Sequence, residues 1–378
     1  MDADTIIVGA GPAGLSTGLF LQQAAPNLAR RTLILEQAHH PRPKLCAGGL
    51  LPSVDVYLRL LGLDPDAIPS APVREIVLQF EQRTAVIRRL PLVFRTVRRE
   101  DFDAWLARCA RERGIQIQEG VRVRRVERRE GWMVAVTDRG PLCAQAIVGA
   151  DGSKSVVRSA IVGGAEPKHL ARLIEVRCAG AARRSPDQAN FDFSHIPAGV
   201  QGYAWDFPSP GIGDNLRTWG VYDSRIRSGR PHPSLKPFLD ESLRLDNGQA
   251  RDLGVQGHPL RWFHPRAVLS APRVLLVGDA AGTDPVVGEG ISFALGYGQV
   301  AAAALQDAFE RDDFSFAGYR RQVRRHRIGR FLMRRYVAAV LLYGLQSRTA
   351  YRLVWPALGL LARALFVDWG DRRAARTG

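Results

Sequence analysis

The hydrophobic and polar positions at the start of the chain predict a nucleotide-binding unit. An apolar run over residues 4–9 indicates a buried β-strand, "GAGPAG" follows as a turn of small residues, and "LSTGLFLQQA" continues with helical character. A second apolar run, "RTLILE", indicates another strand and ends at Glu36. This order of strand, glycine-rich turn, helix and strand is typical of a dinucleotide-binding βαβ unit.

The spacing of the small residues indicates what this unit binds. Gly9, Gly11 and Gly14 stand in G-x-G-x-x-G spacing, which lets the backbone approach a pyrophosphate at the positive end of the helix. Glu36 lies 22 residues beyond Gly14, at a position where an acid accepts the ribose hydroxyls and repels a 2′-phosphate. The predicted ligand is therefore FAD or NAD and not NADP.

Two later segments, 146–158 and 273–298, each run from a strand through a Gly-Asp turn into a helix. With the opening motif they make the sequence similar to the FAD-dependent oxidoreductases of the aromatic hydroxylase fold group. The resemblance implies that Asp279 binds the ribityl chain, that residues 288–291 face the pyrophosphate and the flavin, and that Asp151 and Gly152 lie beside the pyrophosphate. It also implies a cofactor-facing Arg99 on a helix over 98–114.

The residues expected at the FAD are then Gly9, Gly11, Pro12, Ala13, Gly14, Glu36, Lys44, Cys46, Ala47, Arg99, Val123, Asp151, Gly152, Gly278, Asp279, Gly288, Glu289, Gly290 and Ile291.

Strand-like runs separated by Gly, Pro and Asp turns interrupt this nucleotide-binding pattern. We expect an α/β fold with a Rossmann-type FAD-binding domain, an inserted antiparallel β-sheet that forms the wall of a substrate cavity, and a C-terminal helical region. The expected boundaries are 1–70, 97–165 and 265–310 for the discontinuous FAD-binding domain, 71–96 and 166–264 for the substrate-binding sheet domain, and 311–378 for the helical region.

The composition modifies this prediction only slightly. The net charge is +16, but only four of the 53 basic residues are lysines, so the excess is more typical of genome composition than of a nucleic-acid-binding face. The four cysteines form no Cys-x-x-Cys pair and the histidines do not cluster, so no disulfide framework and no metal site are predicted. A strand that begins almost at Met1 is unlike a signal segment, and a cytoplasmic protein is expected.

A ten-residue stretch, "PRPKLCAGGL" (41–50), narrows the expected chemistry. Together with "YAWDFP" (203–208) it is similar to the K-x-C-x-G-G-L and Y-x-W-x-F-P elements of the geranylgeranyl reductase family, whose flavoenzymes saturate isoprenoid double bonds in archaeal lipids, chlorophyll side chains and menaquinone tails. The resemblance spans residues 4–310. It departs at Asp206, where an apolar residue is more usual, and at Ser209-Pro210, where the family continues with Lys-Gly.

Reduction of an isolated alkene needs a hydride from the reduced flavin, a proton for the other carbon and a dry apolar channel. Cys46 is a candidate for donating or positioning that proton, or else a small buried hydrophobe. Gly48 and Gly49 are expected to let the backbone pass over the flavin. Tyr203 and Trp205 lie on the same side of a strand, where they either line a prenyl channel or belong to the hydrophobic core.

Two interpretations of Lys44 stay open: it is a solvated charge on a loop, or it neutralises negative charge of the cofactor. The electron donor is NAD(P)H, ferredoxin or another small carrier, since no second glycine motif marks a nicotinamide site.

The last fifth of the chain carries 15 arginines from 311 to 378 and two apolar runs over 337–345 and 353–367. The arginines of 320–335 surround much of a helical wheel, so no clean amphipathic face is predicted, and neither apolar run is long enough to span a membrane. Two interpretations stay open: a helical cap on the flavin domain, or peripheral docking on an anionic membrane surface, on its inner face.

Two other functions compete with a prenyl reductase. The first is a flavin monooxygenase or halogenase that acts on aromatic or polyketide substrates. This hypothesis explains the cofactor motifs but does not explain the K-x-C-x-G-G-L element. A non-enzymatic nucleic-acid-binding or membrane-binding protein uses the basic tail alone and gives no reason for the flavin motifs.

Overall fold

The computed structural model describes residues 2–89, 91–164, 168–179, 185–211, 216–230, 232–245, 254–345 and 347–367. Its first layer is a six-stranded sheet in the order β18-β19-β12-β1-β2-β8, in which only β18 and β19 pair antiparallel. The strands are β1 (Thr5–Val8), β2 (Thr32–Glu36), β8 (Gln116–Glu119), β12 (Ala146–Gly149), β18 (Ser270–Ala271) and β19 (Val274–Leu276). The central strands are buried along their whole length, which explains their continuous apolar runs.

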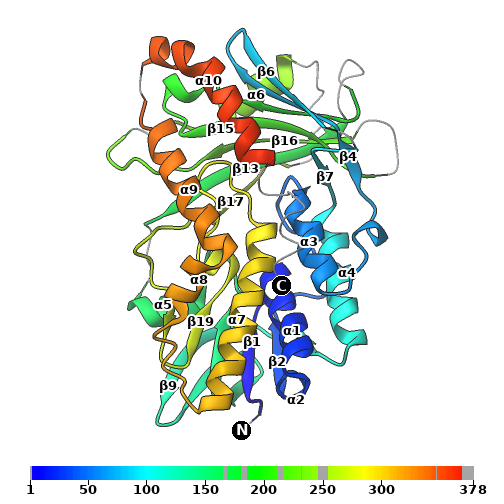
Figure 1. Cartoon of the computed structure of the whole chain (residues 1–378), viewed down its shortest axis with the longest axis vertical. Coiled ribbons are helices and arrows are strands. Elements are labelled where there is room, and N and C mark those ends of the chain that lie inside the picture. Colours follow the sequence, from blue (N-terminus) through cyan, green and yellow to red (C-terminus); the bar gives the residue numbers. More distant parts are fainter. Residues whose placement is uncertain are drawn as a thin grey trace.

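Two long helices pack side by side against this sheet (Figure 1). They are α1 (Pro12–Ala24), which begins where β1 ends, and α7 (Ile291–Arg311). Small residues allow the close contact, since a Cβ added to Gly298 would lie 2.1 Å from the Oγ of Ser16. The other helices of this part are α2 (Pro26–Arg30), α3 (Pro52–Leu60), α4 (Arg99–Glu112) and α5 (Val156–Val162).

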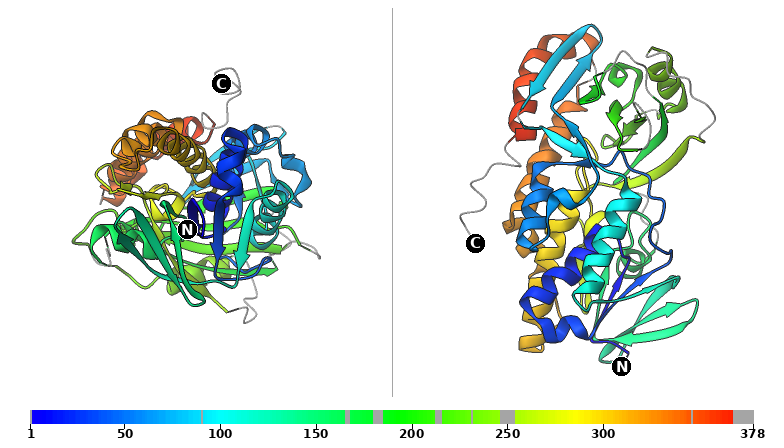
Figure 2. Two further views of the ribbon diagram at one scale, coloured as in Figure 1. Left: turned by 90° about the horizontal axis from the view of Figure 1, so that it is seen from below. Right: turned by 90° about the vertical axis from the view of Figure 1, so that its right-hand side faces the viewer.

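A three-stranded antiparallel sheet lies at the end of the molecule near the N-terminus (Figure 2), with strands β9 (Val123–Arg129), β10 (Trp132–Thr137) and β11 (Gly140–Ala144).

The opposite end is a seven-stranded sheet in the order β17-β13-β16-β15-β14-β5-β6. Its strands are β5 (Glu75–Phe80), β6 (Arg83–Arg88), β13 (Leu170–Ala179), β14 (Gln188–Asp192), β15 (Gly202–Pro208), β16 (Leu216–Asp223) and β17 (Gln256–Arg261). The expectation of a purely antiparallel sheet is wrong at one pair, because β14 runs parallel to β5. The hairpin partner β6 already occupies the other edge of β5, and the long chain between β5 and β14 leaves the direction of β14 free.

The run 71–96 does not stay in one sheet. Its ends form β4 (Ala71–Val73) and β7 (Phe94–Thr96), which join β3 (Gly49–Leu50) in a small separate sheet of order β3-β7-β4. This small sheet fixes the end of the "PRPKLCAGGL" stretch beside the start of α4.

The two faces of the seven-stranded sheet have different neighbours. One face packs against α6 (Lys236–Leu245) through a small apolar cluster that includes Trp219 and Val221. Tyr203, Trp205 and Phe207 belong instead to the main core that this sheet shares with the six-stranded sheet and its helices. The seven-stranded sheet therefore covers the carboxyl ends of the parallel strands of the six-stranded sheet.

The C-terminal part is helical as predicted, with α8 (Tyr319–Arg325), α9 (Arg327–Leu342) and α10 (Arg348–Val367) running up one side of the molecule (Figure 1). The first half of α10 packs against the edge of the seven-stranded sheet, where Trp355 contacts Phe80 with ring centroids 5.4 Å apart. Residues 368–378 of the predicted helical region lie outside the described residues. Among the helices that are described, none combines the length and apolar character needed to cross a bilayer.

Candidate active site

A cavity of about 620 Å³ lies between the two large sheets, within the size range of ligand pockets. The sequence-predicted residues that line it are Gly9, Gly11, Pro12, Ala13, Glu36, Lys44, Cys46, Ala47, Gly49, Arg99, Val123, Asp151, Gly152, Tyr203, Trp205, Gly278, Asp279, Gly288, Glu289, Gly290 and Ile291. Gly14 and Gly48 are not among the lining residues. The structure thus brings segments from across the chain to one cavity.

The three glycines of the opening motif have different reasons to be glycine. A Cβ on Gly14 would lie 2.0 Å from the carbonyl oxygen of Gly9, and a Cβ on Gly9 would lie 2.4 Å from that of Ala150. Both positions are therefore filled by the protein's own backbone. A Cβ on Gly11 would meet nothing closer than Arg42, 3.7 Å away, so this glycine leaves space on the cavity side.

Gly48 resembles Gly14 in this respect. Its φ is +76°, and an added Cβ would lie 1.9 Å from the carbonyl oxygen of Val97. Within the stretch "PRPKLCAGGL", close approach to a ligand is thus left to Gly49, whereas Gly48 lets the loop pack against the start of α4.

Glu36 is buried at the end of β2 and is held in place by the backbone. Its Oε2 accepts a hydrogen bond from the Ala10 N–H at 3.0 Å, and its Oε1 accepts one from the Ala38 N–H at 3.1 Å. Arg42, which the sequence reasoning missed, lies 3.3 Å from Glu36 and 3.4 Å from Asp103. Asp103 in turn accepts both hydrogen bonds of a bidentate pair from Arg99, each 2.9 Å long.

Asp151 lines the cavity, but its side chain is engaged in hydrogen bonds within the protein. Its carboxylate accepts hydrogen bonds from the Ser155 hydroxyl at 2.6 Å and from the Val156 N–H at 2.7 Å. The carboxylate therefore caps the N-terminus of α5. Gly152 beside it has a φ of +78°, and no atom of the described residues lies within 4 Å of an added Cβ, which leaves its cavity side open.

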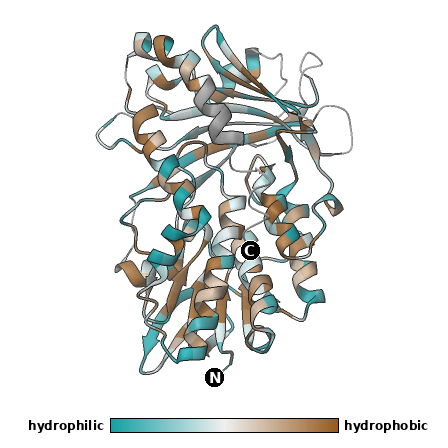
Figure 3. Ribbon diagram, in the orientation of Figure 1, coloured by the Kyte–Doolittle hydropathy of each residue, from teal (hydrophilic) through white to brown (hydrophobic). Residues whose placement is uncertain are grey.

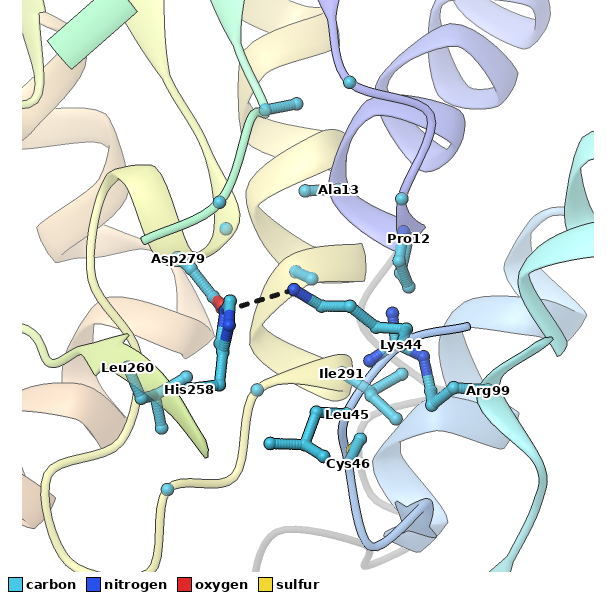
Figure 4. Close-up of a pocket in the computed structure, with 18 of the residues that line it drawn as sticks. Pro12, Ala13, Lys44, Leu45, Cys46, Arg99, His258, Leu260, Asp279 and Ile291 are labelled. Carbon is cyan, nitrogen blue, oxygen red and sulfur yellow. Dashed lines mark hydrogen bonds between the residues drawn. The ribbon is translucent and has the colours of Figure 1, made fainter. Parts of the chain in front are cut away.

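Lys44, His258 and Asp279 point toward one another across the cavity (Figure 4). The Nζ of Lys44 lies 3.3 Å from the Nε2 of His258. Burial and the nearby Lys44 lower the pKa of His258 to about 4, and burial likewise lowers the pKa of Lys44, whereas Asp279 opposes that change. Lys44 thus lies beside His258 on the cavity wall, and a neutral His258 accepts a hydrogen bond from it. His258 carried no signal in the sequence.

The loop from Asp284 to Gly288 forms another part of the wall, and three side chains from β15 and α9 hold it. The Tyr203 hydroxyl on β15 donates to the Val287 carbonyl oxygen at 2.6 Å. The Tyr343 hydroxyl, at the end of α9, donates to the Val286 carbonyl oxygen at 2.6 Å. Asp284 itself, fully buried, pairs with the buried Arg335 of α9 at 2.8 Å.

Cys46 lies where the "PRPKLCAGGL" stretch meets the seven-stranded sheet. It contacts Glu175, which the sequence analysis did not predict. Its N–H donates to the Oε1 of Glu175 on β13 at 3.0 Å, and its sulfur accepts from the Gly48 N–H at 3.4 Å. Burial raises the pKa of the Cys46 thiol, which Arg99 partly opposes. The signal for Glu175 was a charged residue in the strand-like run "ARLIEVR", two positions from Leu173, which also lines the cavity.

Aromatic side chains make the remaining wall apolar. Phe94, Phe191 and Phe207 line the cavity with Tyr203 and Trp205, and the ring centroids of Phe191 and Tyr203 lie 5.0 Å apart. The Trp205 ring covers Gly220 on the neighbouring strand, where an added Cβ would lie 2.1 Å from the indole ring.

Asp206, a departure from the family pattern, does not line this cavity. It lies between Trp205 and Phe207 on β15 and pairs with the fully buried Arg217, while Asn190 donates to it at 3.1 Å. Since successive side chains of a strand alternate in direction, this charge is balanced on the face turned away from the cavity.

These residues fit FAD on the evidence of their own geometry. The open faces of Gly11 and Gly152 leave room for a phosphate backbone beside α1. Five lysine and arginine side chains line the cavity and would complement the charge of a pyrophosphate: Arg42, Lys44, Arg99, Arg122 and Lys154. The fold and the site together define a FAD-dependent oxidoreductase with an apolar chamber next to its cofactor-binding motifs.

Comparisons with known proteins agree with this class. Residues 2–188 match the model of the FAD binding domain family. The digeranylgeranylglycerophospholipid reductase 1 of Methanopyrus kandleri is 30% identical over 333 residues, which cover 83% of each chain. The chain belongs to the geranylgeranyl reductase family of FAD-dependent oxidoreductases, and its cofactor is FAD.

Solved structures add information on the fold. The geranylgeranyl bacteriochlorophyll reductase-like protein of Thermoplasma acidophilum superposes with a TM-score of 0.79 at 22% identity, covering 97% of this chain and 96% of that one. The flavin-dependent halogenase CmlS reaches a TM-score of 0.64 at 23% identity, covering 91% of this chain and 63% of that one. Reductases and halogenases thus share this architecture.

Proposed function

We propose that this protein saturates carbon–carbon double bonds of an isoprenoid chain, of the geranylgeranyl type, with reduced FAD as the hydride source. The observation that carries the proposal is the aromatic wall of Phe94, Phe191 and Phe207 in the same cavity as the cofactor-binding glycines. Such a wall suits a methyl-branched hydrocarbon segment without polar groups, because prenyl groups offer only apolar surface for binding.

In this proposal, different segments of the chain bind the cofactor and the substrate. FAD, when bound and reduced, supplies a hydride to one alkene carbon. The segments 1–70, 97–165 and 265–310 hold the cofactor, with Glu36 at the ribose, and the segments 71–96 and 166–264 hold the prenyl chain. Tyr203 and Trp205 orient the alkene and exclude water from it.

The test is mass spectrometry of prenyl lipids incubated with the purified, FAD-loaded protein under anaerobic conditions, with dithionite as electron source. We expect product masses to rise by two hydrogens for each saturated bond, and no such rise without the protein. A protein that leaves prenyl lipids unchanged but hydroxylates or halogenates an aromatic substrate when oxygen is admitted would contradict the proposal and support the monooxygenase or halogenase alternative.

We also propose that α8, α9 and the start of α10 dock on an anionic membrane that holds the lipid substrate. On α9, Arg330, Arg334, Val337 and Leu341 are all exposed, and their spacing places them on one face. α8 is mainly hydrophilic, whereas hydrophobic residues are frequent along α9 (Figure 3). The face that the helical wheel left undefined emerges because Arg335 turns inward to Asp284.

This docking predicts a charge-dependent affinity for vesicles. Each arginine near an anionic bilayer contributes about 1 kcal/mol, so Arg321→Glu with Arg325→Glu on α8 should weaken co-sedimentation with phosphatidylglycerol vesicles by at least about tenfold. The matched control is Arg124→Glu with Arg128→Glu, two exposed residues of β9, which should bind like the wild type. Equal loss in both variants, or wild-type binding that phosphatidylcholine vesicles match, would contradict the proposal.

A further inference from the structure

We propose that Glu175 is the acid that delivers the proton to the alkene carbon that does not receive the hydride. This inference rests on the proposed reductase function and deepens it. It names a catalytic residue that the sequence motifs do not contain, because Glu175 lies on β13, outside both family-like elements.

The position of Glu175 is the first argument. The side chain lines the same cavity as Cys46 and Trp205, yet the residue is only 6% exposed. Strand register places Glu175 opposite Gly220 of β16, and Gly220 opposite Trp205 of β15. Gly220 has no side chain and the indole ring covers it, so the carboxyl group and the ring lie on the cavity side of one rung with no side chain between them.

The hydrogen bonding of Glu175 is the second argument. One carboxyl oxygen, Oε1, accepts the Cys46 N–H at 3.0 Å, which fixes the group against the "PRPKLCAGGL" loop. The other oxygen, Oε2, is buried and has no hydrogen-bond partner among the described residues. A buried, unpaired carboxylate oxygen is costly, whereas a protonated one keeps its proton until an acceptor arrives.

Burial brings the pKa of this acid near neutral pH. Burial raises the pKa of Glu175 to about 7, with Glu100 adding to the rise and Arg177 and Arg99 opposing it. The Cys46 thiol, the other candidate donor, has its pKa raised by burial above its ordinary value. Catalysis by a general acid is most efficient when its pKa lies near the working pH, which favours the carboxyl group.

The proposed step balances. The alkene π bond supplies the electron pair for the new C–H bond to the proton, the O–H bond of Glu175 breaks, and the hydride from reduced FAD forms the second C–H bond. The flavin is oxidised, the alkene is reduced, and the Glu175 carboxylate regains its proton from water before the next turnover.

The experiment is an anaerobic single turnover. Chemically reduced protein is mixed with a geranylgeranyl lipid, and flavin reoxidation is followed by absorbance. Loss of a general acid costs about 100-fold to 10,000-fold, so Glu175→Gln should slow reoxidation by at least about 100-fold while FAD binding and the unfolding curve stay unchanged. In the wild type the rate should fall as pH rises through about 7, because the acid form is lost there.

Two variants and a second readout complete the design. Glu75→Gln removes a carboxylate of the same sheet that does not line the cavity, and should behave like the wild type. Cys46→Ser keeps the backbone N–H that holds Glu175, and should keep FAD and slow the reaction less than E175Q does. Infrared spectra of the FAD-free wild type below pH 7 should show a protonated-carboxyl stretch that E175Q lacks, beside that of Glu289, whose pKa burial also raises to about 7.

The outcomes separate the two proposals. The role of Glu175 alone would be overturned if the wild type reduces the lipid and E175Q reduces it at the same rate. It would also be overturned if E175Q shows the full wild-type infrared band. A severe loss in C46S with little loss in E175Q would assign the proton to the thiol instead. A wild type that reduces no prenyl lipid would overturn the proposed function and this inference with it. If E175Q does not fold, a wild-type rate that is flat through pH 7 overturns the inference.

Discussion

Arg335→Met is expected to lower the free energy of unfolding by about 3–5 kcal/mol, because it leaves the Asp284 carboxylate buried without its counter-charge. Both residues are almost completely inaccessible, at 1% and 0% exposure. Asp284 also accepts hydrogen bonds from the N–H groups of Val286 and Val287, so its displacement should loosen the loop that lines the cavity. Urea denaturation followed by tryptophan fluorescence measures the loss, and FAD titration measures the effect on the cofactor.

The neighbouring Arg334 supplies the control for this prediction. It is exposed on α9, so Arg334→Met should change stability by no more than about 0.5 kcal/mol. The double variant Asp284→Asn with Arg335→Met should recover part of the loss, since it removes both charges. Equal stability of R335M and R334M would show that the buried pair does not hold the loop.

Gly11→Ala is expected to leave the protein folded but to weaken FAD binding by about tenfold to a hundredfold. Its φ of −85° suits alanine, and the nearest atom to the added methyl group is 3.7 Å away. The methyl group would instead occupy the space beside the N-terminus of α1 where the pyrophosphate is expected, and overpacking of this size costs about 1–3 kcal/mol. Fluorescence titration of the apoprotein with FAD measures the affinity.

Gly14→Ala is the informative comparison, because its methyl group would collide with the Gly9 carbonyl oxygen at 2.0 Å. This variant should lose stability even without FAD, whereas G11A should unfold within about 1 kcal/mol of the wild type, the range of an N-cap change. An unchanged FAD affinity in G11A would contradict the placement of the pyrophosphate at this turn.

Much of the cofactor site was readable from the sequence, for a physical reason. Strand, glycine turn and helix are local patterns, and the spacing of the glycines and the acid follows from the short turns between them. The expected positions of Gly11, Glu36, Asp279 and Gly290 all fall on one cavity. The resemblance carried by "PRPKLCAGGL" and "YAWDFP" indicated the family on the same basis.

Local patterns did not indicate which distant side chains meet. The Cys46–Glu175 contact joins positions 129 residues apart, and the Lys44–His258 contact joins positions 214 residues apart. The inward turn of Arg335 depends on a single carboxylate in another segment. By itself, the sequence determined the cofactor-binding turns and the apolar strands, since these follow from short-range backbone and burial preferences. Only the tertiary structure decided the register that sets Glu175, Gly220 and Trp205 on one rung, because strand pairing between remote segments is fixed by the packing of the whole sheet.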